Sequence, residues 1–590
     1  MSRPFYGFIS NRCTGTLVSP IGVVEWLPWP RFDGDAVFCR LLDDTQGGFL
    51  STLPLDPILE RRQSYVDGTL LLQTGLVTSS GQAVWTDFLP LGRAAFWRRI
   101  ETDVPLRLIC RPTFGFGAAN ASYELRDDGA LFYHPDGSEG IQLHIRGRAE
   151  KLEERDAWLV GPGPVDLQLR YAADIIQEGD YLARPLEEGD RVETVTRQYW
   201  RGTAVTYHGP WQEWVHQSAL TLRGLSYRNN GAMLAAATTS LPEVPGEQRQ
   251  WDYRYVWVRD GAYGAEALLL AGDTVSCRQF LEFMFNVMDL VEKPYPSPFV
   301  CVDGTLVNGE RELLWLSGYH GSRPVRVGNA ASSQVQGDIE GGLLWLLLRY
   351  WRLTGDRTFI RDYWWAVEAQ AEWLRSHWQD ADASLWEFRD APRPYTHSRA
   401  LAWVGLGAAA ALALEVLNNR ARAVRWRHEQ DRIKTTIYDD ALQHGGRFTQ
   451  SFGVPGADAA LLTLPLYGFV AVSDPIFRRT LALIEAELVQ DGLVFRYRQD
   501  PLGHPPYPFT LAGFWLARVY LRQGRMAEAD AVIGRHAELA TELKLFAEHV
   551  DAESGEPHGN FPQLFPHAGL VTALMERQRV ARGAPLWRLP

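Results

Sequence analysis

The stretch Ser398-Arg-Ala-Leu-Ala-Trp-Val-Gly-Leu-Gly-Ala-Ala-Ala-Ala-Leu-Ala-Leu-Glu-Val-Leu417 decides how the larger part of this chain folds. No charged residue occurs between Arg399 and Glu415, so a helix formed by it would present apolar or small side chains in every direction. Its uncharged run of 15 residues is shorter than the roughly 20 that a membrane span needs. We therefore expect a helix that is buried on all sides in the centre of a globular domain.

The neighbouring segments alternate in character. Residues 330–351 are also mostly apolar or small, whereas residues 361–378 and 421–442 each carry a clear polar stripe. Such an alternation is typical of two concentric rings of helices, with the apolar helices inside. Twelve segments with helical periodicity follow Trp211, and they begin near Gln212, Asp260, Ser276, Ala330, Thr358, Ser398, Ala421, Ala457, Asp474, Phe509, Met526 and Phe565. Twelve paired helices predict a closed barrel whose functional residues gather on the loops at one end.

The N-terminal part has a different period. Up to about Ala204 apolar and polar residues alternate over short stretches such as 15–26 and 165–174, and turn signals such as Asp-Asp-Gly at 127–129 separate them. Short alternating stretches at a spacing of roughly 8–12 residues are typical of an antiparallel β-sandwich. We predict a β-sandwich domain over residues 1–204 and a helical-barrel domain over residues 205–590.

Composition excludes several classes of partner. The 590 residues carry a formal net charge of −12 and only four lysines, so we expect no binding to nucleic acid or to a membrane surface. The 22 Trp, 22 Tyr and 26 Phe include the polar-tipped aromatic residues from which sugar-binding clefts are built. The five cysteines are widely spaced, which indicates neither a disulfide framework nor a zinc cluster. The N-terminal residues carry no secretory signal pattern, and we expect a cytoplasmic protein.

Aromatic residues gather ahead of one predicted helix. Trp251-Asp-Tyr-Arg-Tyr-Val-Trp-Val-Arg-Asp260 offers faces that can stack on a sugar ring and, at its end, an arginine and an aspartate that can hold hydroxyl groups. The candidate binding residues in it are Tyr253, Tyr255, Trp257, Arg259 and Asp260. A plainer interpretation makes Asp260 an N-cap.

Two glutamates are candidates for acid–base chemistry. Glu387 lies between Trp386 and Phe388, and an aromatic setting would raise its pKa so that it stays a proton donor. Glu548, in the loop before the last helix, is the candidate partner carboxylate. Each of them, taken singly, also fits an ordinary surface acid. Two further loops carry candidate binding arginines, Arg326 in the glycine-rich stretch 318–329 and Arg496 in Gly492-Leu-Val-Phe-Arg-Tyr497, although a structural turn and a surface ion pair explain them equally well.

The ordered set of motifs resembles glycoside hydrolase family 15, which comprises glucoamylases, glucodextranases and bacterial and archaeal trehalases. The likeness rests on YVWVRD before a helix, GSRPVRVGNAA, LWE before THSRALAW, GLVFRY, and a glutamate shortly before HGNFPQ, and it covers nearly the whole chain. The resemblance implies an N-terminal antiparallel β-supersandwich followed by an (α/α)6 barrel. It also implies exo-acting hydrolysis of α-glucosides with inversion. No zincin motif, dinucleotide-binding fingerprint or Gly-x-Ser-x-Gly elbow occurs in the sequence, so we expect no cofactor or metal to be required.

The resemblance also assigns roles by motif position. Glu387 matches the general acid and Glu548 the general base. Arg259 and Asp260 match the pair that holds the non-reducing glucose, and Tyr253, Tyr255 and Trp257 match the aromatic wall beside it. The remaining residues that match substrate-binding positions are Trp386, Arg496 and Arg326, with Asn329 in the same loop as Arg326.

The substrate stays open among α-1,4-, α-1,6- and α,α-1,1-linked glucosides. The leading hypothesis is release of β-D-glucose from small oligosaccharides, as in glucoamylases, and the alternatives are a trehalase and a dextran glucohydrolase. Trehalase-like members usually carry DVYGE after the GSRPVR loop, but residues 338–342 read DIEGG, and residues 505–508 also depart from the family pattern. We expect both departures to affect aglycone binding. A non-catalytic sugar-binding relative and a phosphorylase are the readings from other classes, and the oligomeric state is not readable from the sequence.

Overall fold

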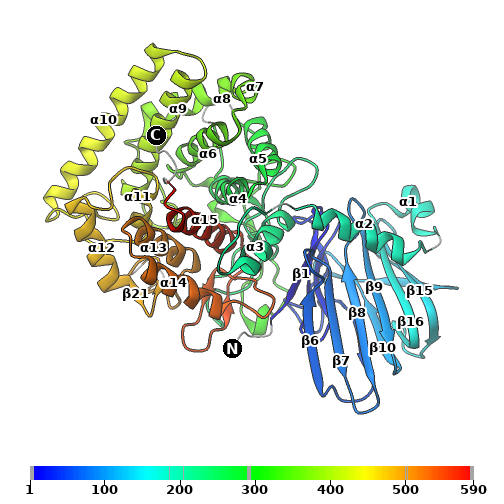
Figure 1. Ribbon diagram of the computed structural model, residues 1–590. Coiled ribbons are helices and arrows are strands. Elements are labelled where there is room, and N and C mark those ends of the chain that lie inside the picture. The colour runs from blue at the N-terminus through cyan, green and yellow to red at the C-terminus, as the bar shows by residue number, and fades with distance from the viewer. Residues whose placement is uncertain are drawn as a thin grey trace.

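The computed structural model describes residues 5–584 except 185, 204, 289–293, 499 and 501–502. Its strands and helices occupy two separate parts (Figure 1): the blue-to-cyan strands lie to one side, and the green-to-red helices form the other part. The N-terminal part is thus rich in strands and the C-terminal part is helical, as the two sequence periods predict.

Fourteen strands of the described residues join in one antiparallel sheet. They are β1 (Gly7–Ser10), β2 (Gly15–Val18), β3 (Val24–Pro28), β4 (Ala36–Phe38), β5 (Phe49–Pro54), β6 (Glu60–Tyr65), β7 (Leu72–Val77), β8 (Gln82–Phe88), β9 (Ala95–Thr102), β10 (Leu106–Arg111), β13 (Ser122–Arg126), β14 (Gly129–Tyr133), β15 (Gly140–Lys151) and β16 (Ala157–Ala172). A separate ladder joins β11 (Thr113–Phe114) to β12 (Ala119–Asn120).

The long strand β16 bends the sheet into two layers. The order is β1-β2-β3-β5-β10-β16-β9-β8-β7-β6, and β16 pairs with β10 through residues 157–160 and with β9 through residues 163–170. Between these two stretches Gly161 and Gly163 adopt φ values of +77° and +104°, a conformation that favours glycine. The first strand then contacts β7 and β8 near the other end of the order. The result is the β-supersandwich that the resemblance implies.

Two helices follow the last strand where the sequence analysis expected strand-like structure. They are α1 (Ile175–Leu182) and α2 (Gly189–Arg201). The buried residues of α2 include Val192, Thr196 and Trp200, which lie four positions apart on one helical face. This spacing is the sequence signal for α2, and the turn signal Glu-Glu-Gly-Asp at 187–190 marks the start of the helix and not a hairpin turn.

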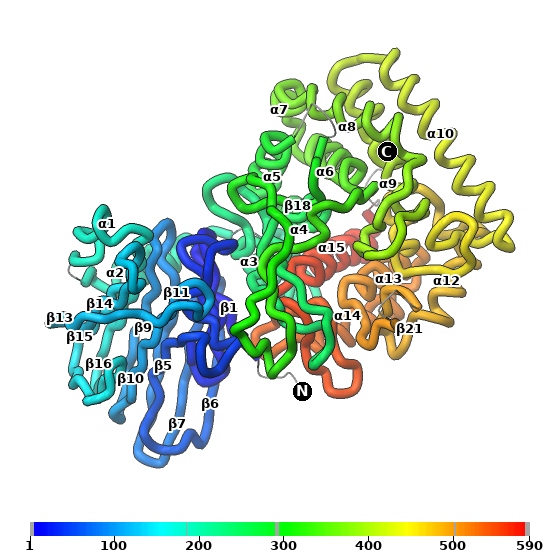
Figure 2. Tube along the Cα trace, turned by 180° about the vertical axis from the view of Figure 1, so that it is seen from behind, coloured from blue at the N-terminus to red at the C-terminus, as the bar shows by residue number. Residues whose placement is uncertain are grey.

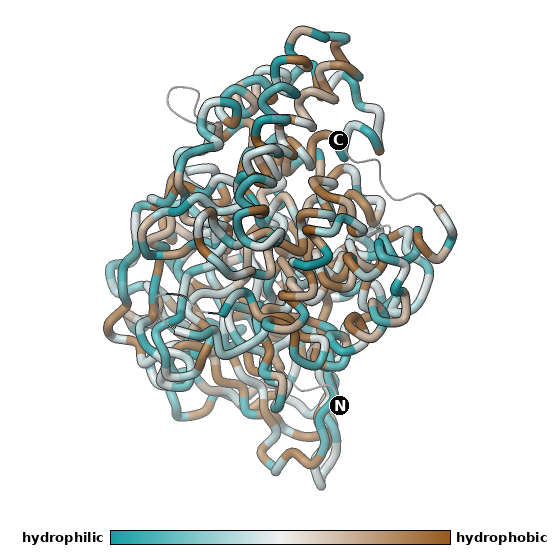
Figure 3. The backbone as a smooth tube through the Cα atoms, turned by 90° about the vertical axis from the view of Figure 1, so that its left-hand side faces the viewer, coloured by the Kyte–Doolittle hydropathy of each residue, from teal (hydrophilic) through white to brown (hydrophobic). Residues whose placement is uncertain are grey.

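The helical part is a double ring. The inner helices are α4 (Val258–Ala271), α6 (Ile339–Thr354), α9 (Thr396–Glu415), α11 (Thr463–Leu466), α13 (Thr510–Arg522) and α15 (Leu564–Ala581). Each contacts the next in this order, and α15 contacts α4, so the ring closes. The outer helices are α3 (Gln212–Gly224), α5 (Thr274–Asn286), α7 (Arg357–Asp362), α8 (Trp364–His377), α10 (Arg420–Gln443), α12 (Pro475–Leu488) and α14 (Met526–Leu539). In Figure 3 brown, hydrophobic segments gather towards the middle of this part, and teal ones are more frequent on its outer windings.

The segment that opened the sequence analysis forms α9. By length and composition it is the one helix of the described residues that could cross a membrane, but 94% of its apolar window is buried inside the protein. It is therefore a core helix of the barrel. The predicted helix near Ala457 is much shorter than expected, because only a 3-10 turn at Ala459–Leu462 and the four-residue α11 form there, and Gly468 follows with a φ of +79°.

Short ladders and turns stand on the barrel loops. They are β17 (Val256–Trp257) with β18 (Phe299–Val300), β19 (Glu310–Glu312) with β20 (Arg326–Gly328), β21 (Val489–Gln490) with β22 (Leu493–Val494), β23 (His549–Val550) with β24 (Pro557–His558), and the 3-10 turns Tyr319–Gly321 and Ala330–Ser333.

The sheet part supports the loop that carries the aromatic motif. Figure 2 shows β1 beside α3 where the two parts meet, and these two elements are in contact. Arg254 donates to the backbone oxygen of Gly34 at 2.6 Å and forms an ion pair with Asp252 at 2.7 Å. Because Arg254 binds both the sheet part and Asp252, the two residues that flank Tyr253 are fixed and hold Tyr253 in place on the barrel side.

Candidate active site

Two cavities that share lining residues lie at one end of the helical ring. The inner cavity, of about 50 Å³, is lined by Ala235, Tyr253, Trp257, Arg259, Asp260, Leu385, Trp386, Glu387, Arg496, Phe509, Glu548, Gln563 and Phe565. The outer cavity, of about 250 Å³, is lined by Glu243, Gln248, Arg249, Trp251, Tyr253, Arg326, Asn329, Trp386, Glu387, Phe388, Arg389, Arg496, Tyr497 and Asp500. Eight of the ten predicted site residues line the inner cavity, and Arg326 lines only the outer one.

The inner helices explain why these residues meet. Arg259 and Asp260 lie in the first turn of α4, Glu387 lies in the loop that leads to α9, Arg496 lies in the loop before α13, and Glu548 lies in the loop before α15. All of these loops open at the N-terminal ends of inner helices. The ring therefore brings residues that are remote in sequence to a single end of the barrel.

Hydrogen bonds at its base and to its backbone fix the loop that carries Glu387. Asp382 and Arg393 pair across its base, and Asp382 Oδ1 accepts from the backbone nitrogen of Ser384 and from the hydroxyl of Ser398. Gln334 donates to the backbone oxygen of Glu387 at 3.3 Å. Glu387 itself has a φ of +58°, a left-handed conformation that a glutamate adopts only when its surroundings impose it.

The surroundings of the Glu387 carboxylate differ from the expected ones. Its Oε1 accepts from Trp257 Nε1 at 2.6 Å, from Gln336 Nε2 at 3.1 Å and from Arg259 at 3.2 Å. The adjacent side chains have partners of their own, because Trp386 Nε1 donates to Asp458 at 2.7 Å and Phe388 stacks on Tyr395. The carboxylate thus lies among N–H donors, and the apolar setting predicted from its sequence neighbours is wrong.

Arg259 and Asp260 take different parts in the site. Arg259 is bound within the protein, to Gln336 at 2.7 Å, to Asp338 at 3.5 Å and to Glu387. Asp260 Oδ1 is 3.6 Å from Arg259 Nε, and no hydrogen bond to it occurs among the described residues. Burial raises the pKa of Asp260 to about 7, against the opposing effect of Arg259. Of the two, Asp260 is the group with an oxygen left for a ligand.

Glu548 is the more deeply buried of the two candidate catalytic acids. Its backbone oxygen accepts from Thr510, and the next residue, His549, pairs with Phe509, so α13 positions the loop. Tyr253 donates its hydroxyl hydrogen to Glu548 Oε1 at 3.2 Å. Burial and the charge of Glu243 raise the pKa of Glu548 to about 8.

The aromatic wall is present with one exception. Tyr253 and Trp257 meet edge to face at 5.7 Å, and Trp257 stacks on Phe299 at 4.1 Å. Tyr255 lies outside both cavities, where its hydroxyl oxygen accepts from the backbone nitrogen of Gly328 at 3.1 Å. A bend in the chain at Tyr255 breaks the alternation that would have placed it beside the other two. A direct role of Tyr255 in the wall is therefore corrected to support of the neighbouring loop.

The candidate binding arginines are both paired within the protein. Arg496 lines both cavities and donates to Glu243 at 2.6 Å. Arg326 donates to the backbone oxygens of Gln248 and Gln250 and forms an ion pair with Glu310 at 3.2 Å. Both side chains thus shape the cavity walls, and Asn329 in the loop beside Arg326 lines the outer cavity as well.

Sequence reasoning missed three groups that contact the candidate catalytic residues. Gln336 bridges Arg259 and Glu387, Glu243 holds Arg496, and His549 lies 3.7 Å from Glu548. His549 directly follows the predicted base in sequence, which is a signal that could have been used. Gln336 falls in the segment predicted as a helix from Ala330, but α6 begins only at Ile339, so Gln336 lies in the loop before it. Glu243 lies in a loop without periodicity, and no local pattern distinguishes it.

The two departures from the family pattern lie in different places. Gly342, at the position of the missing acid, lines a separate small cavity in the barrel core beneath Arg259 and not the outer cavity. The expected effect of this departure on aglycone binding is therefore not supported by its position. Residues 505–508 line neither cavity, but the backbone oxygen of Pro508 contacts His549, next to Glu548, and Tyr507 stacks on His558.

A closed double ring of helices with two glutamates on one cavity is the architecture of a helical-barrel glycoside hydrolase. Residues 209–533 match the family model "Glycosyl hydrolases family 15", and residues 5–184 match the model "Trehalase-like, N-terminal". The chain belongs to glycoside hydrolase family 15.

Proteins named trehalases align with nearly the whole chain. It is 39% identical to Trehalase 1 and 36% identical to Trehalase 2 of Sulfolobus acidocaldarius, over 97% and 98% of this chain and 98% and 100% of those proteins. It is 32% identical to the trehalase of Mycobacterium tuberculosis, over 97% of this chain and 88% of that protein. These matches confirm that the protein is a glycoside hydrolase.

Among solved structures, a bacterial glucoamylase complexed with acarbose has the same two-part fold. The TM-score is 0.75 at 13% identity, and the match covers 98% of this chain and 95% of that one. At this identity the likeness concerns the fold alone, and it confirms the predicted supersandwich and (α/α)6 barrel. The assignments of individual site residues stay predictions.

Proposed function

We propose that the protein is an inverting α,α-trehalase. The observation that carries the proposal is that Glu387 and Glu548, from loops far apart in sequence, line one small cavity. Support for trehalose over the oligosaccharides favoured by the sequence analysis comes from the relatives named trehalases, which align with both the sheet part and the barrel. The two connected cavities lie near the lower end of the roughly 300–1,000 Å³ range of small-molecule sites, which suits a disaccharide.

The proposed mechanism places trehalose across the two cavities, with the glucose that water attacks at the inner one. Asp260 accepts a hydrogen bond from a hydroxyl group of the glucose in the inner cavity. Trp257 and Tyr253 pack against the ring of this glucose. Glu387 Oε1 is occupied by its three donors, and the second oxygen, Oε2, carries the proton to the glycosidic oxygen. Glu548 takes a proton from the attacking water on the other face of the sugar.

Inversion makes the two products distinguishable. The glucose attacked by water leaves as the β anomer, whereas the glucose that leaves with the glycosidic oxygen keeps its α configuration. Early in the reaction, proton NMR of a trehalose digest in phosphate-free buffer is expected to show equal amounts of α- and β-glucose. Formation of α-glucose alone would contradict inversion, and a requirement for phosphate would indicate a phosphorylase.

A substrate panel tests the choice of linkage. We expect turnover of trehalose to exceed that of maltose and isomaltose at least tenfold in kcat/KM, because each missing hydrogen bond in a built polar site costs about that factor or more. Hydrolysis of maltose or isomaltose without hydrolysis of trehalose would instead support the glucoamylase or dextran glucohydrolase reading. Binding of trehalose without cleavage of any of the three sugars would support a non-catalytic relative.

A further inference from the structure

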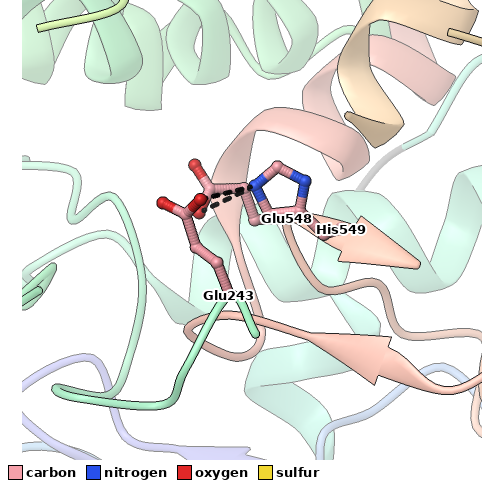
Figure 4. Close-up of side chains that lie close together, drawn as sticks. All are labelled: Glu243, Glu548 and His549. Atoms are coloured by element: carbon pink, nitrogen blue, oxygen red, sulfur yellow. Dashed lines mark ion pairs between the residues drawn. The ribbon is translucent and has the colours of Figure 1, made fainter. Parts of the chain in front are cut away.

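Three buried titratable side chains, the proposed base among them, converge at one place (Figure 4). Glu243 comes from the loop after α3, and Glu548 and His549 come from the loop before α15. One carboxylate oxygen of each glutamate and a ring nitrogen of His549 lie within 4.8 Å of one another. Each of the three residues is at most 5% exposed. We refer to Glu243, Glu548 and His549 as the buried trio.

The contacts of the imidazole define where its hydrogen lies. His549 Nδ1 is 3.1 Å from the backbone oxygen of Pro508, and because a carbonyl oxygen only accepts, Nδ1 carries the hydrogen. In the neutral ring Nε2 then presents a lone pair. This lone pair is 3.6 Å from Glu243 Oε2 and 3.7 Å from Glu548 Oε2. Three acceptor atoms therefore face one another inside the protein.

Such an arrangement needs a proton. Neither Glu548 Oε2 nor His549 Nε2 has a hydrogen-bond partner among the described residues. Acceptors that face one another in a buried site repel, and two carboxylates that share such a site hold a proton between them. One proton within the buried trio turns the repulsion into an attractive contact.

The neighbours of the trio decide which member holds that proton. Burial raises the pKa of Glu243, but Arg496, which donates to it at 2.6 Å, together with Arg249, brings this pKa below its ordinary value. Burial lowers the pKa of His549 to about 3. Burial and the Glu243 charge raise the pKa of Glu548 to about 8. At neutral pH Glu243 is thus ionised, His549 is neutral and Glu548 carries the proton.

The charged or titratable groups around the trio are Tyr253, Asp260, Arg249, Arg496, Tyr497 and His558. Arg496 and the Tyr253 hydroxyl favour ionisation of Glu548, whereas Asp260 opposes it. A divalent cation is a poor occupant of the trio, because the guanidinium of Arg496 already places a positive charge against Glu243.

Resting on the proposed function, we propose that Glu243 and His549 are positioning residues that keep one proton on Glu548 and thereby set the lowest pH at which this base works. In a turnover an O–H bond of water breaks, its oxygen bonds to the sugar carbon and its proton goes to ionised Glu548. The bond between that carbon and the glycosidic oxygen breaks, and Glu387 gives its own proton to the leaving oxygen. One proton passing through solvent from Glu548 to Glu387 restores both groups.

The replacement Glu243→Gln tests the proposal. Its amide oxygen can still accept from Arg496, but the negative charge beside Glu548 is lost. The base then ionises at lower pH, and the acid limb of the kcat/KM profile with trehalose is expected to move at least about one pH unit downwards, the usual size of the effect of a charge at this range. The matched control is Glu372→Gln. It removes a partly exposed carboxylate of the outer helix α8, which pairs with Arg425 of α10, and it should leave the pH profile unchanged.

If Glu243 had only a structural role, its replacement would not shift the acid limb of the kcat/KM profile. An unshifted acid limb in a variant whose thermal unfolding resembles that of the wild type, or a shift to higher pH, would overturn the proposal. A thermal stabilisation by added Zn²⁺ or Mg²⁺ in the wild type, but not in Glu243→Gln, would also overturn it, because the trio would then hold a cation.

A second measurement works even when Glu243→Gln does not fold. The infrared difference spectrum between the wild type and Glu548→Gln at neutral pH is expected to contain the C=O band of a protonated carboxyl, which disappears above about pH 8. Absence of this band would refute the proton-holding trio. Near-normal turnover by Glu548→Gln would instead reject Glu548 as the base, and with it the proposed mechanism, so the two failures are distinguishable.

Discussion

The loops of Glu387 and Glu548 surround their carboxylates in opposite ways. The Glu387 side chain is 22% exposed and receives three N–H donors on one oxygen. The Glu548 side chain is 6% exposed, accepts the Tyr253 hydroxyl and faces a second carboxylate. Sequence neighbours would suggest the reverse, because Glu387 lies between two aromatic residues and Glu548 between alanine and histidine. The difference teaches that side chains remote in sequence decide the electrostatics of each acid.

The largest expected effect separates the roles of the two acids. Glu387→Gln and Glu548→Gln should each lower kcat on trehalose by about 10²–10⁴-fold. With α-D-glucosyl fluoride, whose leaving group needs no proton, Glu387→Gln should recover most of its activity while Glu548→Gln stays impaired, as measured by fluoride release. Recovery by Glu548→Gln and not by Glu387→Gln would show that the acid and base roles are exchanged.

A smaller effect compares single donors on the two acids. Tyr253→Phe removes the one donor that Glu548 Oε1 has among the described residues, and we expect a loss of about 10–100-fold in kcat, since a hydrogen bond to a charged group contributes about 1.5–3 kcal/mol. Trp257→Phe keeps an aromatic ring on Phe299 but removes one of three donors to Glu387, and the loss should stay below about tenfold. A larger loss for Trp257→Phe than for Tyr253→Phe would contradict the contrast between Glu548, which has one hydrogen-bond donor, and Glu387, which has three.

The smallest expected effect concerns the outer cavity. Arg389 lies over the Trp251 ring at 3.7 Å and pairs with Glu310 at 3.8 Å, contacts that contribute about 0.5–1 kcal/mol at a partly exposed site. Arg389→Ala should raise KM for trehalose by about two- to fivefold with kcat almost unchanged. The control Arg427→Ala removes an exposed arginine of α10 and should leave both constants as they are. A fall in kcat as large as that of Tyr253→Phe would place Arg389 in the chemistry and not in binding.

Much of the fold was predictable because periodicity is a local property. The wholly apolar segment 398–417 became an inner helix and the striped segment 421–442 an outer one, as their patterns required. The amphipathic helix α2 escaped prediction because the turn signal at its start fits the spacing of a β-sandwich as well as the start of a helix. The short α11 escaped it because apolar composition alone does not set the length of a helix.

By itself, the sequence determined the order of the helices, their inner or outer placement, and the loops on which candidate site residues lie. These follow from hydrophobic spacing and motif order, which each segment carries within itself. Only the tertiary structure decided that Gln336 and Arg259 reach Glu387, that Tyr255 turns away, and that Glu243 and His549 meet Glu548. The physical reason is that burial and Coulomb interactions act through space, between side chains that the barrel brings together from separate loops.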